Sequence, residues 1–226
     1  QNTILRLKGI SNLRNPVIVS NEGQRFLVAE QMKAINVNPE AIILEPIRKN
    51  TAPAIALAAI TALRNYLDPT LLILSSDHNI DDEENFRKVI EAGLQESNKD
   101  KLVTFGIVPS SPETGFGYIQ TNDEISDNFK CRKIKKFIEK PNIELAKELF
   151  KSKHYLWNSG IFLFKASTIL KEIEKYQPEI LRICKESFEK GKEDLDFFRI
   201  NLEIFKNCPD VPIDIAVMEK TNLGSV

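Results

Sequence analysis

Short apolar runs separated by amphipathic stretches make up the first half of the chain. The runs Val17–Ser20, Ala41–Glu45 and Leu71–Leu74 are too short for helices and are bounded by turn-forming residues, so they are predicted to be strands. Apolar residues at helical spacing lie between them, around Phe26–Ile35 and Leu57–Leu63. This alternation predicts right-handed βαβ units, that is, an α/β fold with a mixed, mainly parallel sheet and helices on both faces. We expect Leu71–Leu74 to be a buried parallel strand.

The second half mixes strands with loops rich in glycine and proline. Leu102–Ile107 is predicted to be a strand, and Cys131–Lys140 alternates apolar and basic residues as a half-exposed strand does. Tyr155–Lys165 is an aromatic strand interrupted by the polar stretch 158–160, which predicts either a bulge or a ligand at that point. Ser167–Cys208 has a helical pattern.

A polar cluster follows the Leu71–Leu74 strand. Ligands of open α/β sheets bind beyond the carboxyl ends of the strands, where a carboxylate can hold a hard cation such as Mg²⁺ that carries substrate phosphates. Asp77 is therefore a candidate metal ligand and catalytic residue. A turn or helix N-cap aspartate, just before an acidic helix start, explains its position equally well. His78 has no second ligand at metal-binding spacing, so it is predicted to orient the loop.

Three loops carry further candidate residues. Glu45–Pro53 is a rigid polar loop that ends where Thr51 can cap a helix; its backbone N–H groups suit a base or a phosphate, although spacing alone favours a plain connection. The glycines of Val108–Ile119 allow either close approach to a ligand or a hairpin turn. Glu139 and Lys140 end a predicted strand and should face opposite sides, which predicts separate tasks and no salt bridge.

Composition narrows the function classes. With 226 residues, of which 42% are hydrophobic, the chain can form one large α/β domain. Lysine and arginine number 31 against 32 acidic residues, so we expect no nucleic-acid partner and no membrane partner. Three distant cysteines fit reduced thiols in a cytoplasmic protein better than disulfides or a zinc cluster. A charged-then-apolar leader and a run of 18 or more apolar residues are not seen, so we expect neither secretion nor a membrane span.

Six stretches, spread in order over nearly the whole chain, resemble one protein family. They are EPIRKNTAPAIALAA (Glu45–Ala59), LILSSDH (Leu72–His78), FGIVPSSPETGFGYI (Phe105–Ile119), FIEKP (Phe137–Pro141), LWNSGIFLF (Leu156–Phe164) and PIDIAVMEKT (Pro212–Thr221). Together they are similar to the sugar-phosphate nucleotidyltransferases, most closely to the mannose-1-phosphate guanylyltransferases. The resemblance implies a Rossmann-like nucleotide-diphospho-sugar transferase fold in one catalytic domain over residues 1–226.

The same resemblance implies a reaction and a set of roles. The phosphate of mannose 1-phosphate would attack the α-phosphorus of GTP, giving GDP-mannose and pyrophosphate without a general base. Asp77 would bind the Mg²⁺ between the two substrates, and Lys140 would hold the sugar phosphate. Glu139 and Asn158 would contact the mannose. The other implied substrate-binding residues are Glu45, Arg48, Asn50, Thr51 and Ala52 near the guanine and ribose, Ser76 beside Asp77, and Gly115 and Gly117 at the mannose.

Two parts of the family pattern are absent from this sequence. The glycine-rich loop of the form GGxGxRLxP would precede the helix at Gln1–Ile10, and a second metal-binding aspartate would follow Val226. The resemblance therefore implies an internal piece of the catalytic domain that is weak or inactive by itself. A non-catalytic nucleotide-sugar-binding subunit and a sister enzyme with another base or sugar stay open as alternatives. A homodimer is one assembly that the sequence allows.

Overall fold

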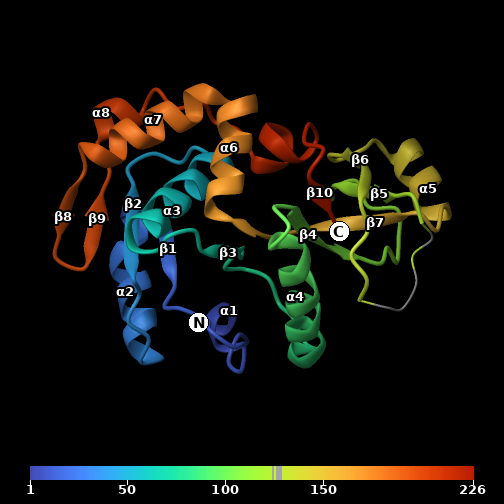
Figure 1. Cartoon of the computed structure of the whole chain (residues 1–226), viewed down its shortest axis with the longest axis horizontal. Helices are drawn as coiled ribbons and strands as arrows, with labels where there is room; N and C mark the ends of the chain where they lie inside the picture. Colours follow the sequence, from blue (N-terminus) through green and yellow to red (C-terminus); the bar gives the residue numbers. More distant parts are fainter. Residues whose placement is uncertain (124, 126–128) are drawn as a thin grey trace.

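The strands of the computed structural model form two sheets in the part of the chain that it describes, residues 1–123, 125 and 129–226 (Figure 1). The first sheet has the order β1-β2-β9-β8. Strands β1, β2 and β9 run parallel, whereas β8 and β9 form an antiparallel hairpin. Its strands are β1 (Val17–Asn21), β2 (Ala41–Glu45), β8 (Lys192–Asp194) and β9 (Phe197–Arg199).

The second sheet is organised around the long strand β7 (Tyr155–Lys165), which pairs antiparallel with β3, β4 and β5. Strand β6 pairs antiparallel with β5, and β10 pairs parallel with β4. The predicted parallel, buried strand at Leu71–Leu74 is therefore wrong in both respects, because β3 (Thr70–Ile73) is antiparallel to β7 and half-buried. Sequence alternation describes chain neighbours, whereas the partner of β3 comes from the second half of the chain. The remaining strands are β4 (Leu102–Ile107), β5 (Tyr118–Thr121), β6 (Ile134–Ile138) and β10 (Gly224–Ser225).

Helices flank the sheets, so the predicted mixed α/β class is confirmed. The sheets are not mainly parallel as predicted, because three strand pairs in the described residues are parallel and five are antiparallel. Helix α3 (Thr51–Asn65) contacts β1 and β2 as well as α6 and α7. Its buried face is rich in alanine, and burying one larger residue such as Leu57 contributes about 1.5–3 kcal/mol. The other helices are α1 (Asn2–Leu5), η1 (Glu22–Gln24), α2 (Arg25–Ala34), α4 (Glu83–Ser97), α5 (Ile143–Lys151), α6 (Ala166–Tyr176), α7 (Pro178–Glu189), α8 (Leu202–Phe205) and the π-helix η2 (Asp214–Met218).

The stretch Ser167–Cys208, predicted to be helical, also contains the β8–β9 hairpin. Each strand of the hairpin has only three residues, too few to give a recognisable alternation. The hairpin is attached to the sheet by pairing of β9 with β2, a contact between distant parts of the sequence. Figure 1 shows it at one end of the molecule beside α7 and α8, with α5, β5 and β6 at the other end.

Strand β7 contains the bulge that its polar interruption predicts. Asn158 lies opposite Gly106 and Phe162 lies opposite Thr104, so four steps along β7 match two along β4. Gly160, inside the bulge, has a φ of 69°, a conformation that residues with side chains rarely adopt. The interruption is therefore a structural feature of the sheet, and it sets the position of Asn158.

Candidate functional site

Gly117, Glu139 and Asn158 lie together beside β5, β6 and β7. The backbone N–H of Asn158 donates to the carbonyl oxygen of Gly117 at 2.8 Å. A Cβ atom on Gly117 would lie 2.7 Å from Glu139 Oε2, a separation that real Cβ atoms essentially never show. Glycine at this position therefore leaves room for the carboxylate of Glu139. Three residues that the sequence assigns to the sugar side thus form one cluster.

Lys140 forms an ion pair with its neighbour Glu139, with 3.1 Å between Nζ and Oε1. The prediction that these two residues do not pair is wrong. Strand β6 ends at Ile138 and Lys140 has a positive φ of 43°, so the alternation of faces within a strand does not apply to them. The Lys140 side chain is 64% exposed. Exposed pairs of this kind contribute about 0–1 kcal/mol, so an anionic ligand can replace Glu139 as the partner of Lys140.

The Asn158 amide is held by hydrogen bonds on both of its polar atoms. Its Oδ1 accepts from Thr104 Oγ1 at 3.0 Å and from the Gly160 N–H at 3.2 Å. Its Nδ2 donates to Asp214 Oδ1 at 2.8 Å. Burial, followed by the charge of Glu139, raises the pKa of Asp214 to about 6. The sugar-side cluster therefore contains a second carboxylate.

Sequence reasoning assigned no role to Asp214. It lies within the stretch PIDIAVMEKT that carries part of the family resemblance, and it is the only acidic residue in the apolar run Val211–Met218. A lone acid in such a run is the signal that could have identified it. Its importance depends on contact with Asn158, which is 56 positions away in the sequence.

Gly115 lies close to this cluster in the chain but has open space around it. Apart from its chain neighbours, no heavy atom in the described part of the chain lies within 4 Å of a Cβ built on it. The adjacent Phe116 packs edge-on against Trp157, with ring centroids 5.1 Å apart, and the Tyr118 hydroxyl donates to the Glu113 carbonyl at 2.9 Å. These contacts hold the loop near β7, and the predicted approach of Gly115 to a sugar stays a prediction.

Asp77 lies in an exposed bend after β3, next to Ser76. Its Oδ1 accepts from Ser75 Oγ at 2.7 Å, and this hydrogen bond is the main reason that its pKa is lowered. The carboxylate is therefore ionised at neutral pH. Asp77 is not the helix cap that the alternative explanation allowed, because the carboxylate of Asp82 caps α4 by accepting from the Asn85 N–H at 3.0 Å.

The loop around Asp77 is fastened to α1 through backbone carbonyls. Thr3 Oγ1 donates to the carbonyl of Ser76 at 3.3 Å, and the buried Arg6 donates to the carbonyl of His78 at 2.7 Å. An ionised aspartate on such a loop fits Mg²⁺, which takes one or two carboxylates and completes its coordination with water and phosphate oxygens. Among the described residues, no group of three or more His, Cys, Asp or Glu side chains could hold a metal ion.

The loop between β2 and α3 begins at Glu45 and ends at a capped helix. Asn50, with a φ of 66°, accepts from the Thr51 N–H through Oδ1 at 3.1 Å and is therefore the cap of α3. The prediction that Thr51 caps this helix is wrong, because asparagine tolerates the left-handed conformation that the turn requires. Pro53 lies in the first turn, as predicted.

Thr51 and Ala52 instead connect the loop to the end of the chain. Thr51 Oγ1 accepts from the Ile213 N–H at 2.8 Å, and the Ala52 N–H donates to the Val211 carbonyl at 3.2 Å. Arg48 is exposed on the loop. The predicted base-side loop is thus joined directly to the segment that carries Asp214.

Glu45 is a buried residue with one carboxyl oxygen, Oε1, that has no hydrogen-bond partner in the described part of the chain. Only 8% of the residue is exposed. Burial raises its pKa to about 7. An unpaired buried polar group costs about 1–3 kcal/mol, so this position is a candidate for ligand binding.

Asp77 and Lys140, the two predicted catalytic residues, each have a local partner, Ser75 and Glu139. In the portion of the chain that is described, no hydrogen bond or ion pair joins the two side chains. The structure therefore gathers the predicted sugar side into one cluster and links the base-side loop to Asp214. A shared cleft for Asp77 and Lys140 stays a prediction.

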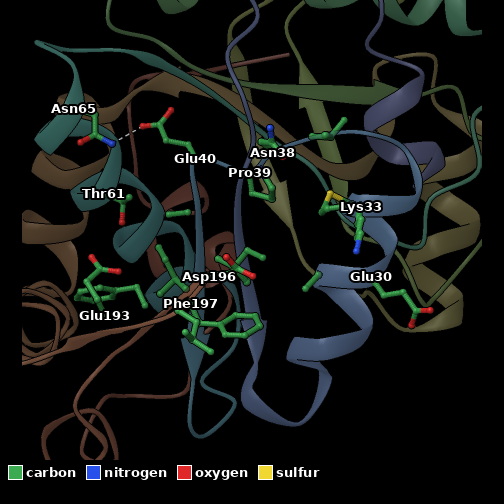
Figure 2. A pocket seen from close by; sticks show the side chains of 18 of the residues that line it. Glu30, Lys33, Asn38, Pro39, Glu40, Thr61, Asn65, Glu193, Asp196 and Phe197 are labelled. Carbon is green, nitrogen blue, oxygen red and sulfur yellow. Dashed lines mark hydrogen bonds between the residues drawn. The ribbon is translucent and has the colours of Figure 1, made fainter.

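A cavity of about 1090 Å³ lies elsewhere, between α2, the start of β2, the end of α3 and the β8–β9 hairpin (Figure 2). Glu30 and Lys33 of α2 and Phe197 of the hairpin line it, and Asn65 donates to Glu40 Oε1 at 2.6 Å beside it. None of the predicted site residues lines this cavity. Size alone therefore does not identify the site that the sequence predicts.

These features define a mixed α/β protein that gathers carboxylates, an amide and a cation beside strands β5, β6 and β7. The profile of a protein family described as nucleotidyl transferase matches residues 1–202. The chain belongs to this nucleotidyl transferase family, as the six matching stretches predict. In the described residues, no helix has both the length and the apolar character that crossing a bilayer requires.

Two curated relatives carry a more specific name. The mannose-1-phosphate guanylyltransferase of Escherichia coli is 45% identical over 225 residues, 98% of this chain and 47% of that protein. The mannose-1-phosphate guanylyltransferase RfbM of Salmonella typhimurium is 48% identical over 223 residues, 98% of this chain and 46% of that protein. The chain thus spans about half the length of the curated relatives it matches. A solved structure described as mannose-6-phosphate isomerase from Helicobacter pylori has a TM-score of 0.88 and 32% identity, covering 99% of this chain and 86% of that one.

Proposed function

We propose that the protein carrying this chain is a mannose-1-phosphate guanylyltransferase, which forms GDP-mannose and pyrophosphate from GTP and mannose 1-phosphate. The observation that carries the proposal is the cluster of Glu139, Asn158 and Gly117 with Lys140 at its edge. A carboxylate accepts hydroxyl hydrogens, an amide N–H donates to a hydroxyl oxygen, and an ammonium group attracts a phosphate. These are the groups that a sugar phosphate presents. Identities of 45% and 48% to two guanylyltransferases support the same sugar and base.

Glu45 supports guanine as the base. The guanine edge carries two adjacent donors, N1–H and the exocyclic amino group, and a carboxylate can accept from both; adenine presents an acceptor at N1 instead. Glu45 has a buried oxygen that lacks a donor. Guanine would supply that donor once the Glu45 carboxylate turns toward the base, because Oε1 is covered in this structure; a base without the donor would leave the carboxyl group unpaired, which is how buried polar groups reject the wrong ligand.

The reaction needs positive charge and positioning more than a base. An oxygen of the sugar phosphate attacks the α-phosphorus of GTP and forms a new P–O bond. The bond from the α-phosphorus to the oxygen that bridges to the β-phosphorus breaks, and its electron pair leaves with pyrophosphate. The attacking oxygen is already anionic, so no proton has to be removed.

Lys140 would reduce the repulsion between the two anionic substrates. Unit charges about 4 Å apart attract by roughly 4 kcal/mol at an effective dielectric constant of 20, and exposure of Lys140 makes this an upper bound. Asp77 would hold Mg²⁺ together with phosphate oxygens, and the ion when bound supplies further positive charge.

The Cys131, Cys184 and Cys208 thiols are free, which supports a reducing compartment, the cytoplasm.

A substrate competition tests this proposal. The complete gene product is incubated with Mg²⁺, mannose 1-phosphate and an equimolar mixture of GTP, ATP, UTP and dTTP, and the nucleotide sugars are separated and quantified. We expect GDP-mannose to be the main product, with a matching amount of pyrophosphate. Glucose 1-phosphate in place of mannose 1-phosphate is the control for the sugar. Equal use of the four nucleotides, or no transfer to mannose 1-phosphate, would contradict the proposal.

A further inference from the structure

Asp214 is a half-buried carboxylate of the sugar-side cluster whose function is so far unexplained. It begins η2, and its Oδ1 accepts from Asn158 Nδ2 at 2.8 Å. Glu139 and Lys140 are the charged groups that act on it, with opposite effects on its pKa. Asp214 is thus connected to each of the polar side chains that we place at the sugar phosphate.

The contacts of Asn158 allow only one orientation of its amide. A side-chain amide can be turned by 180°, which exchanges its oxygen and its nitrogen. The Gly160 N–H can only donate, so it requires the amide oxygen, and the ionised Asp214 carboxylate can only accept, so it requires the amide nitrogen. The two groups together therefore fix which atom of Asn158 faces which way.

This orientation determines what Asn158 can offer to a ligand. Its oxygen accepts from the Gly160 N–H and lies 3.0 Å from Thr104 Oγ1, whose single hydrogen is shared with the Ile161 carbonyl at 2.9 Å, so that oxygen faces the protein; one of the two N–H groups is used by Asp214. One N–H remains, so Asn158 can act toward a ligand only as a donor. The ionised Glu139 carboxylate, in contrast, has no hydrogen to donate and acts only as an acceptor. A hydroxyl group both accepts and donates, so the pair matches the hydroxyls of a sugar.

The backbone around Asp214 is anchored before the ligand arrives. Val211 and Ile213, just upstream, are hydrogen-bonded to Ala52 and Thr51 at the start of α3. The π-helix η2, which begins at Asp214, is buried through Ala216, Val217 and Met218. Asp214 therefore has little freedom to move away from Asn158. Anchoring of this kind is what holds a binding group in its productive geometry.

We propose that Asp214 is a positioning residue for the sugar phosphate: its carboxylate holds the Asn158 amide so that the remaining N–H group donates to a hydroxyl of the sugar. This inference rests on the proposed function for the identity of the substrate. It assigns Asp214 an effect on sugar-phosphate binding that is exerted through Asn158, and little effect on the nucleotide.

A double-mutant cycle with Asp214→Ala and Asn158→Ala tests the proposal in the complete gene product. The assay runs at pH 8, where the Asp214 carboxylate, with a pKa of about 6, is ionised. We expect Asp214→Ala to raise KM for mannose 1-phosphate about tenfold and KM for GTP less than about twofold, as for the loss of one hydrogen bond. In the Asn158→Ala background, Asp214→Ala should have no further effect, because its partner is gone.

Two further variants separate positioning from a general structural role. Asp214→Asn should return KM for mannose 1-phosphate to within about threefold of wild type, because its amide oxygen still accepts from Asn158. Asp210→Ala, an exposed residue on the same segment, is the matched control and should change neither KM. If the effects of Asp214→Ala and Asn158→Ala multiply, or if both substrates are affected equally, the positioning role is wrong.

Calorimetric titration with mannose 1-phosphate alone separates this inference from the proposed function. The Kd for mannose 1-phosphate should change in the same way as KM: Asp214→Ala should raise it in the wild-type background and should not raise it further in the Asn158→Ala background. If the protein binds mannose 1-phosphate with the coupling but does not transfer guanylyl groups, the proposed function fails and the positioning role holds. If transfer occurs and the cycle is additive, the positioning role fails alone. If the wild type does not bind mannose 1-phosphate, both the proposed function and the positioning role are wrong.

Discussion

Replacing Glu45 by glutamine should remove a pH-dependent loss of stability. The carboxyl group is 8% exposed and has a pKa of about 7 in place of the usual 4.5. Its proton is therefore bound more tightly in the folded protein than in the unfolded chain. The contribution of Glu45 to the free energy of unfolding is therefore largest below pH 4.5, and it is lost as the pH rises through 7.

The size of the effect follows from the two pKa values. The difference between 4.5 and about 7, at 1.36 kcal/mol per pH unit, corresponds to about 3 kcal/mol for a full titration. Between pH 5 and pH 8 the wild type should lose roughly 2–3 kcal/mol through this group. Glu45→Gln has no proton to lose, so its stability relative to wild type should rise by the same amount over this range. Asp214, whose pKa is also raised, is present in both proteins and cancels in the comparison.

Urea denaturation of both proteins at several pH values between 5 and 8 measures this difference. Glu91→Gln is the matched control, because Glu91 is exposed on α4, and it should show no change with pH beyond about 0.5 kcal/mol. A difference between wild type and Glu45→Gln that stays constant from pH 5 to pH 8 would contradict a raised pKa for Glu45 in the folded protein. In the complete gene product, the same variant should also weaken GTP binding by about tenfold or more if Glu45 contacts guanine.

Three further changes test the site in the complete gene product. Lys140→Ala should raise KM for mannose 1-phosphate about tenfold and more than KM for GTP; steady-state kinetics showing equal effects would contradict its assigned side. Asp77→Asn should raise the Mg²⁺ concentration needed for half-maximal activity, and an unchanged Mg²⁺ titration would remove it as the ligand. Gly117→Ala should displace the Glu139 carboxylate, because the new Cβ would lie 2.7 Å from Oε2 at the end of that flexible side chain, and should therefore raise KM for mannose 1-phosphate while the free energy of unfolding falls by less than about 1 kcal/mol. Gly115→Ala, with open space around it, is the control and should leave thermal stability unchanged.

Local patterns predicted the parts of the fold that depend on neighbouring residues. The aromatic run Tyr155–Lys165 is strand β7 with the predicted bounds, and its polar interruption is the predicted bulge. The acidic helix start predicted just after Asp77 is the beginning of helix α4, at Glu83. In each case the periodicity of apolar residues, an acidic helix start or a glycine reflects an interaction inside a short segment.

Features that depend on distant contacts were missed or wrongly predicted. Strand β3 pairs with β7 and the β8–β9 hairpin pairs with β2, and neither partner can be deduced from sequence neighbours. Backbone conformation caused the other two errors, because positive φ values at Asn50 and Lys140 moved a helix cap and created an ion pair. Asp214 was missed because only the contact with Asn158 shows its importance.

A structure of the complete gene product with bound GDP-mannose would show directly where the sugar and the base bind. We expect mannose hydroxyls within hydrogen-bond distance of Glu139 and of the remaining N–H of Asn158, and the guanine edge at the Glu45 carboxylate. A sugar bound away from the cluster of Gly117, Glu139 and Asn158, for example in the cavity beside the β8–β9 hairpin, would contradict this expectation.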